Sequence, residues 1–201
     1  PKPALLNWEE AASIPVCGGT AYRMLVSDRG ARMKQGDIVL IWGASGGLGA
    51  YAAQLVRNGG GIAVGVVGSQ EKEAIARKLG CHVVINREEI GIGGDAGDDP
   101  EQAVKAGKRL GAVIRREVGE DPHIAFEHVG RATFGISVFV VRRGGAVVTC
   151  GSSTGYHHTF DNRYLWMKLK RIIGSHIANL QEMTDCVRLF EQGRIAPVVS
   201  E

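Results

Sequence analysis

The stretch Asp37-Ile-Val-Leu-Ile-Trp-Gly-Ala-Ser-Gly-Gly-Leu-Gly49 joins an apolar run directly to a glycine-rich segment. The run is short, β-branched and without strict alternation, as in a strand buried on both faces of a parallel sheet. Glycines let a backbone turn tightly and approach a pyrophosphate, and the free N–H groups at a helix start favour its negative charge. The stretch therefore predicts a strand, a phosphate-binding turn and a helix.

Five further strand–helix units follow along the chain. The expected strands are residues 37–42, 62–67, 83–85, 124–126, 146–149 and 171–173, and the expected helices are 47–58, 70–79, 102–117, 133–141, 162–169 and 180–192. Six such units predict an α/β fold of the Rossmann type, a doubly wound parallel six-stranded sheet of order 3-2-1-4-5-6 with helices on both faces. Ligands of such sheets bind at the carboxyl ends of the strands.

Two stretches depart from this alternation. Residues 7–33 have a helical pattern that precedes the sheet, and we expect Pro15 and the Gly18-Gly19 pair to break it into two helices. Residues 91–100 are rich in glycine and aspartate, which predicts a mobile loop before the next helix.

The composition argues against several classes of protein. The 201 residues are 44% hydrophobic, and 24 basic against 21 acidic residues give a net charge of +3, too small and scattered to indicate nucleic-acid binding. No apolar run is long enough to span a bilayer and no signal-peptide pattern is present, so we expect a protein off the membrane. The cysteines are far apart, which predicts reduced thiols in the cytoplasm and no zinc site. They are Cys17, Cys81, Cys150 and Cys186.

The glycine-rich segment is the strongest signal for a ligand. It has a strand before it and a helix after it, the context that a dinucleotide-binding turn requires. The alternative is that the glycines only let the helix pack closely on the strand. The residues expected at the cofactor here are Gly43, Ser45, Gly46, Gly47, Leu48 and Gly49.

The end of the second strand predicts which dinucleotide binds. A carboxylate there would bind the ribose 2′-OH of NAD, whereas a 2′-phosphate requires cations instead. Gly68 and Ser69 occupy this position, Lys72 lies one turn on, and Arg87 follows the third strand, so the sequence favours NADPH. The alternative makes Ser69 a helix N-cap and Lys72 a solvated side chain.

Turns after later strands should meet the nicotinamide end of the cofactor. His128 follows the fourth strand, where Glu127 could form a structural hydrogen-bonded pair with it. Gly151 and Ser152, with Ser153 and Thr154 directly after them, follow the fifth strand, and small hydroxyl residues can hydrogen-bond a carboxamide without crowding it.

Several segments in one order resemble a known family. The N-terminal pattern at residues 8–22 and the glycine-rich segment resemble the medium-chain dehydrogenase/reductase superfamily, in its quinone- and enoyl-reductase branch. The segments at 41–49, 126–131, 161–167 and 170–176 together resemble crotonyl-CoA carboxylase/reductases. The resemblance runs from about Trp8 to the end of the chain.

The resemblance implies a domain organisation. Residues 1–33 would be linker helices leading from a GroES-like catalytic domain, 34–195 the NADP-binding domain, and 196–201 the start of the return to the catalytic domain. The family forms homodimers and homotetramers through this domain's sheet edge and neighbouring surfaces. On this interpretation the chain by itself should show no turnover, because the other wall of the active site is missing.

The resemblance also implies the chemistry. Such enzymes transfer a hydride from NADPH to the β-carbon of an enoyl-CoA thioester, and the resulting enolate attacks CO2 at its α-carbon. The family's counterpart of His176 helps hold CO2 through a hydrogen bond; the alternative is a histidine that caps the turn. Arg163 and Tyr164 would belong to the adenine pocket for coenzyme A; the alternative places Tyr164 in the core.

Two other functions remain open at this point. One is a plain NADPH-dependent enoyl or quinone reductase, which would need neither His176 nor the Arg163-Tyr164 pair. The other is a non-catalytic nucleotide-binding module.

Overall fold

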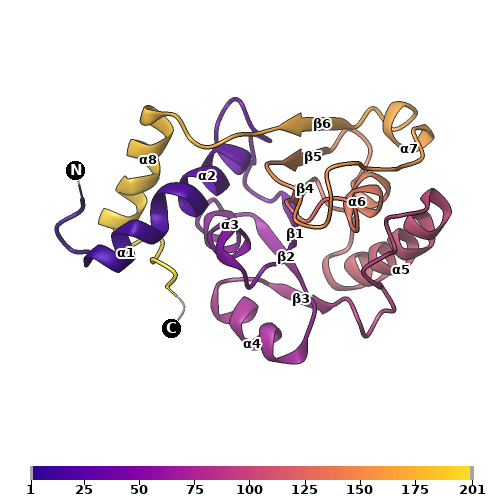
Figure 1. The fold of residues 1–201 in the computed structure, drawn as a ribbon, viewed down its shortest axis with the longest axis horizontal. Coiled ribbons are helices and arrows are strands. Elements are labelled where there is room, and N and C mark those ends of the chain that lie inside the picture. Colours follow the sequence, from indigo (N-terminus) through magenta and orange to yellow (C-terminus); the bar gives the residue numbers. More distant parts are fainter. Residues whose placement is uncertain (1, 200–201) are drawn as a thin grey trace.

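The computed structural model describes residues 2–199 and contains one six-stranded parallel sheet of order β3-β2-β1-β4-β5-β6, which confirms the predicted topology (Figure 1). Residues 1, 200 and 201, at the outer ends of the expected first and last segments, lie outside the described residues. The strands are β1 Ile38–Trp42, β2 Ile62–Val67, β3 Val83–Asn86, β4 Ile124–Glu127, β5 Ala146–Thr149 and β6 Arg171–Gly174.

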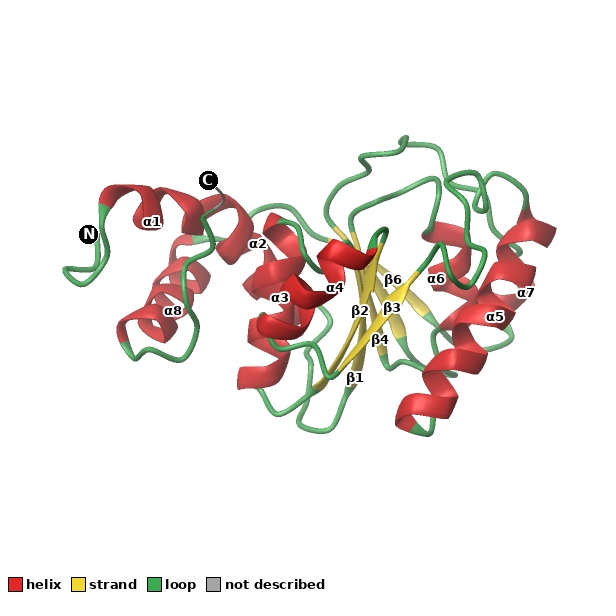
Figure 2. Cartoon of the chain, turned by 90° about the horizontal axis from the view of Figure 1, so that it is seen from below, coloured by secondary structure: helices red, strands yellow, loops and turns green. Residues whose placement is uncertain are grey.

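Helices cover both faces of the sheet, as Figure 2 shows. One side carries α1 Trp8–Ser13, α2 Gly19–Leu25, α3 Gly47–Asn58, α4 Gln70–Lys78 and α8 Leu180–Glu191. The other side carries α5 Pro100–Val118, α6 Phe134–Val140 and the four-residue α7 Arg163–Trp166, which is shorter than the sequence predicts.

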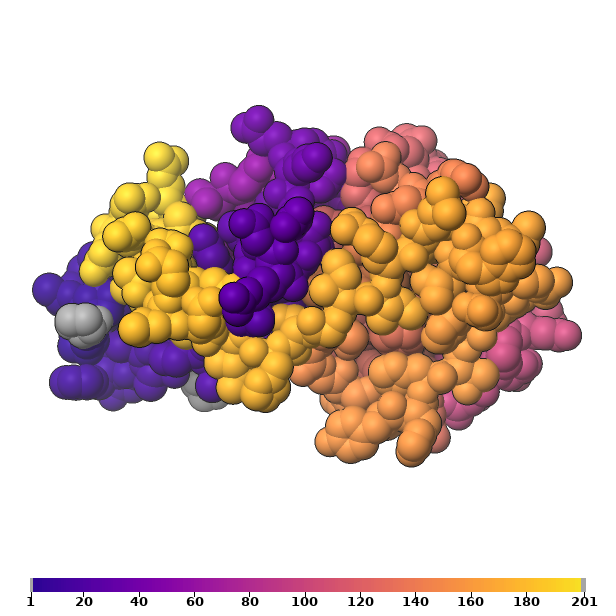
Figure 3. Space-filling view, turned by 90° about the horizontal axis from the view of Figure 1, so that it is seen from above, coloured from indigo at the N-terminus to yellow at the C-terminus, as the bar shows by residue number. Residues whose placement is uncertain are grey.

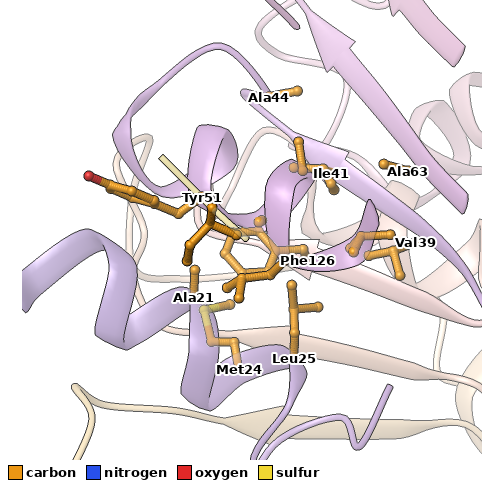
Figure 4. Close-up of a cluster of buried hydrophobic side chains, with 14 of the residues drawn as sticks. Ala21, Met24, Leu25, Val39, Ile41, Ala44, Tyr51, Ala63 and Phe126 are labelled. Carbon is orange, nitrogen blue, oxygen red and sulfur yellow. The ribbon is translucent and has the colours of Figure 1, made fainter. Parts of the chain in front are cut away.

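The central strand β1 divides the core into two clusters. Successive side chains of a strand point to opposite faces, and all five positions of β1 are buried. Val39 and Ile41 pack with Met24 and Leu25 of α2 and Phe126 of β4 (Figure 4). The alternate positions of β1, including Trp42, belong to the second cluster under α5 and α6. This two-sided burial explains why the strand sequence is continuously apolar.

The N-terminal helical region differs from the expectation of a break. A π-helical turn, Ile14–Gly18, joins α1 to α2, so the helical path is continuous from Trp8 to Leu25. Pro15 lies in the π-helical turn, whose wider spacing interrupts the α-helical hydrogen-bond ladder where proline has no N–H to donate. Gly19 has right-handed helical angles, and a side chain there would crowd Met183 of α8. The glycines therefore allow close helix packing and do not end the helix.

Residues 91–98, here called the strap, form a loop as expected, and three of its residues are buried against the domain. Ile92 is 1% exposed, and Ala96 and Gly97 are buried as well. The sequence does not indicate this burial, because the three buried residues are isolated among glycines and aspartates. Within residues 2–199 no helix combines the length and the apolarity needed to cross a bilayer.

Candidate cofactor site

A cleft of about 400 Å³ opens at the carboxyl ends of the central strands. It lies where the strand order reverses between β1 and β4, the position at which doubly wound sheets bind ligands. Its wall is formed by residues from the ends of four strands, the strap and the loop after β5. The lining residues are Trp42, Gly43, Ser45, Gly46, Val66, Val67, Gly68, Lys72, Arg87, Ile92, Gly93, Gly94, His128, Val129, Ala132, Thr133 and Thr154.

The glycine-rich turn forms the floor of this cleft. Gly43 has φ +59°, a left-handed conformation that glycine adopts without strain. A Cβ at Gly49 would lie 2.2 Å from the Gly43 carbonyl oxygen, so only glycine lets α3 start this close to β1. No side chain caps α3, which leaves the N–H groups of its first turn available to an anion. Close packing and phosphate binding are therefore compatible uses of the same glycines.

The cations expected at a 2′-phosphate border one side of the cleft. Lys72 and Arg87 both line it beside Gly68, and no carboxylate is among the lining residues. Arg87 donates from Nη1 to the carbonyl oxygen of Ile92 at 3.2 Å. Ser69 occupies the N-cap position of α4, but its side chain makes no capping hydrogen bond and does not line the cleft.

His128 closes the opposite side of the glycine turn. Its Nε2 lies 2.8 Å from the Trp42 carbonyl oxygen, an acceptor, so this nitrogen carries the proton. Burial lowers the pKa of His128, and the same hydrogen bond partly opposes that shift. The ring is therefore neutral near pH 7 and lies against Gly43, where a Cβ would be 3.2 Å from Cε1.

Glu127 has a structural role, as the sequence favoured, but its partner is not His128. Its fully buried carboxylate accepts hydrogen bonds from the N–H groups of Val129 and Gly130 and from the hydroxyls of Thr133 and Ser137, at 2.8–3.0 Å. Burial raises the pKa of Glu127, and these hydrogen bonds oppose that shift. The carboxylate thereby fixes the turn that carries His128 and Val129 into the cleft.

The loop after β5 reaches the cleft through Thr154, the last residue of the segment expected at the nicotinamide end. Thr154 Oγ1 donates to the Val129 carbonyl oxygen and accepts from the N–H of Ala132. Gly151 and Ser152 do not line the cleft, and Ser152 Oγ lies within hydrogen-bond distance of the Gly155 carbonyl and His158. Only the three-dimensional course of this loop shows which of its residues lines the cleft.

The residues expected at the substrate lie apart from this cleft. His176 follows β6 at the carboxyl end of the sheet, where it is exposed. Arg163 is exposed and pairs with Asp161 at 2.6 Å. Tyr164 packs edge-on against Phe139 with ring centroids 4.7 Å apart. The structure places Gly47, Leu48 and Gly49 in α3, directly behind the glycine turn, but does not bring His176, Arg163 or Tyr164 to it.

The comparisons with known proteins agree with this geometry. A model of the family described as zinc-binding dehydrogenase matches residues 47–192. The chain is 52% identical over 202 residues to a crotonyl-CoA reductase of Streptomyces avermitilis, covering 100% of this chain and 45% of that protein. It is 41% identical over 208 residues to a crotonyl-CoA carboxylase/reductase of Cereibacter sphaeroides, covering 100% and 48%.

Solved structures give the same result. One match is the 2-octenoyl-CoA carboxylase reductase CinF from a Streptomyces species, in complex with NADP and 2-octenoyl-CoA. Its TM-score is 0.97 and its sequence identity is 65%, over 100% of this chain and 45% of that one. The crotonyl-CoA carboxylase/reductase AntE in complex with NADP matches with a TM-score of 0.92 and 39% identity, over 100% and 51%.

Fold and cleft define a dinucleotide-binding domain, and the family match makes this chain a member of the zinc-binding dehydrogenase family. Within the medium-chain dehydrogenase/reductase superfamily it belongs to the crotonyl-CoA carboxylase/reductase family. The chain spans about half the length of the curated relatives that it matches.

The zinc in the family's description has no counterpart in this part of the chain. Among residues 2–199 no three His, Cys, Asp or Glu side chains gather in a way that would hold a metal ion. The four cysteines are free thiols, and those of Cys81 and Cys186 are buried. The described residues therefore do not fit a zinc site, and the function proposed below routes no step through one.

Proposed function

We propose that the protein carrying this chain is an NADPH-dependent enzyme that reduces and carboxylates an α,β-unsaturated acyl-CoA, with this chain as its cofactor domain. The observation that carries the proposal is the cleft itself, in which a glycine turn leads to Lys72 and Arg87 with no carboxylate on the wall. Relatives named as crotonyl-CoA reductases and a neighbour described with NADP and 2-octenoyl-CoA support the substrate class.

The cleft residues would hold the two ends of the cofactor. The first turn of α3, with Gly46, Gly47 and Leu48, would receive the pyrophosphate at its N–H groups. Lys72 and Arg87 would bind the 2′-phosphate. When bound, NADPH would supply the hydride for reduction at the β-carbon of the thioester.

His176 would act at the second half of the reaction. After reduction the enolate carries its electron pair to the α-carbon, which forms a C–C bond with CO2 while one CO2 oxygen gains negative charge. A hydrogen bond donated by the His176 ring would stabilise that oxygen and hold CO2 near the enolate. Arg163 and Tyr164 would bind the adenine end of coenzyme A, since guanidinium groups pair with phosphates and aromatic rings stack on bases.

We also propose the wider organisation of the protein. Residues 1–33 would lead from a catalytic domain and 196–201 would return to it, flanking the NADP-binding domain at 34–195. A homodimer or homotetramer would form at the edge of the sheet next to β6, whose segment of the chain reaches the surface seen in Figure 3. Ile172 of this strand is 39% exposed, and β6 has a neighbouring strand on one side only. Its free thiols suit a cytoplasmic protein.

Calorimetry with both cofactors tests the proposal. The protein should bind NADPH more tightly than NADH, and Lys72→Ala should cost about 1.5–3 kcal/mol of NADPH binding while leaving NADH nearly unchanged. Equal affinity of the unmodified protein for both cofactors would overturn the assignment.

A second candidate is a reductase of the same superfamily that does not carboxylate. It is favoured by the position of His176, which lies outside the cleft that would hold the cofactor. Incubation with crotonyl-CoA, NADPH and bicarbonate separates the two candidates. A carboxylated acyl-CoA as the main product supports the carboxylase, and a saturated acyl-CoA alone supports the reductase.

A further inference from the structure

The strap connects the cleft to α5, a helix that contributes no residue to the cleft wall. Ile92, Gly93 and Gly94 line the cleft beside Arg87, whereas Arg109 lies on the exposed side of α5 outside the lining. Despite this separation, Arg109 donates from Nε to the Ile90 carbonyl oxygen at 2.9 Å and from Nη2 to the Gly91 carbonyl oxygen at 2.7 Å. One guanidinium thus fixes the carbonyl directly before the strap and the first carbonyl of the strap itself.

The strap in turn fixes the direction of Arg87. The N–H of Ile92 donates to the Arg87 carbonyl oxygen at 2.8 Å, and Arg87 Nη1 donates to the Ile92 carbonyl oxygen at 3.2 Å. The Ile92 side chain is buried in the cluster with Trp42 and Leu110, so this carbonyl has a fixed position. A Cβ at Gly68 would lie 3.2 Å from Arg87 Nε, which shows how closely the guanidinium crosses the end of β2.

The far end of the strap is anchored on the turn after β4. Asp98 pairs with Arg131 at 3.1 Å, and a side chain at Gly97 would overlap the backbone of Arg131 and Ala132. The strap therefore crosses from the β3 side of the cleft to the β4 side. Its position depends on Arg109 at one end and on this turn at the other.

We infer that Arg109 is a positioning residue for the choice between NADPH and NADH. It holds the strap, the strap carbonyl of Ile92 holds the Arg87 guanidinium, and Arg87 then meets the 2′-phosphate with its remaining N–H donors. The inference rests on the proposed binding of NADPH in this cleft. NADH lacks only the 2′-phosphate, so the loss of the Arg87 contact with that group weakens NADPH and not NADH.

The experiment measures the dissociation constants of NADPH and NADH for the protein and its variants by calorimetry. Arg109→Ala should raise the dissociation constant of NADPH about five- to twentyfold and that of NADH less than twofold. Arg109→Lys keeps the charge and one of the two hydrogen bonds, so its effect should be intermediate. The matched control is Lys108→Ala, which removes one positive charge from the same helix at a side chain with no hydrogen bond or ion pair among residues 2–199.

A double-mutant cycle shows whether Arg109 acts through Arg87. In the Arg87→Ala background, Arg109→Ala should have no further effect on NADPH, because the contact that it positions is gone. A purely structural role would weaken both cofactors equally, or would weaken NADPH by the same factor with and without Arg87, and either result would overturn the inference. If the unmodified protein shows no preference for NADPH, the proposed cofactor is wrong. That result is obtained before any variant is compared, so it is distinct from a failure of the role proposed for Arg109.

Discussion

At the β1–β3 end of the sheet, Gly43, Lys72 and Arg87 line one cleft, whereas at the β6 end His176 and Tyr164 lie on separate surfaces. The first group comes from short strand–turn–helix units, whose residues are held by the strands themselves. The second group comes from a strand end and from a helix of four residues, reached by a long exposed loop. The difference teaches that a turn between a strand and its helix fixes the positions of its own binding residues. Where binding residues come from distant loops, their positions depend on the contacts that each loop makes.

The largest loss of stability is expected at the glycine turn, where the backbone of β1 and the start of α3 lie closest together. Gly49→Ala places a methyl group 2.2 Å from the Gly43 carbonyl oxygen and 2.7 Å from Ala44 Cα, so α3 must move away from β1. We expect a loss of about 2–4 kcal/mol in the free energy of unfolding together with loss of NADPH binding, measured by denaturant titration and calorimetry. Gly174→Ala at the β6 end is the control, because a Cβ there meets nothing within 4 Å. Similar losses for both variants would erase the contrast between the two ends.

The next effect concerns the buried carboxylate of the β4 turn. Glu127→Gln turns one carboxylate oxygen into an N–H2 group that faces donors, and we expect about 2–3 kcal/mol of destabilisation in denaturant titration. Glu120→Gln makes the same chemical change at an exposed side chain and should shift stability by less than about 0.5 kcal/mol. Equal shifts in the two variants would show that the Glu127 hydrogen bonds contribute nothing.

At the β6 end the expected effect is on the product and not on the fold. His176→Asn in the active enzyme should leave NADPH oxidation largely intact but lower the ratio of carboxylated to protonated product roughly 5- to 150-fold, corresponding to about 1–3 kcal/mol of lost stabilisation. The ratio is measured by mass spectrometry in saturating bicarbonate. An unchanged ratio would remove His176 from the mechanism, and loss of both products would indicate a structural role.

The last effect is a pH dependence of stability at Lys170, the residue directly before β6. Lys170 donates to the carbonyl oxygens of Val138 and Phe139, and burial lowers its pKa from 10.5 to about 8. The unfolded chain keeps the proton up to a higher pH than the folded one, so stability should rise as pH increases from about 8 towards 10.5. Lys170→Arg stays charged over this window, and its stability should lack that rise in denaturant titrations at several pH values. A rise of the same size in the variant would assign it to another group.

The strands were predictable because each is a compact run of apolar residues, and β1 shows both buried faces in its sequence. The glycine turn was predictable for the same local reason. The continuous helix through Pro15 was not, because a π-helical turn depends on packing against α8 and α3 and leaves no periodic signal. The burial of the strap was missed because its anchors Arg109 and Arg131 are distant in sequence and look like solvated cations.

The site residues were also predictable only where a strand end places them. Lys72, Arg87 and His128 reach the cleft from positions next to strand ends, where the topology alone places them. Thr154 and Ser152 are two residues apart in one loop, both hydroxyls form hydrogen bonds, and no sequence pattern distinguishes the residue that lines the cleft from the one that does not.

Trp42 gives the protein an intrinsic optical reporter of occupancy. It ends β1, lines the cleft, is 1% exposed and donates its indole N–H to Ser137 at 2.8 Å, whereas Trp8 and Trp166 are 75% and 62% exposed. A buried indole emits at shorter wavelength than a hydrated one, in the band where a reduced nicotinamide absorbs. Energy transfer from the blue edge of the emission would therefore follow cofactor arrival in real time, without any attached dye.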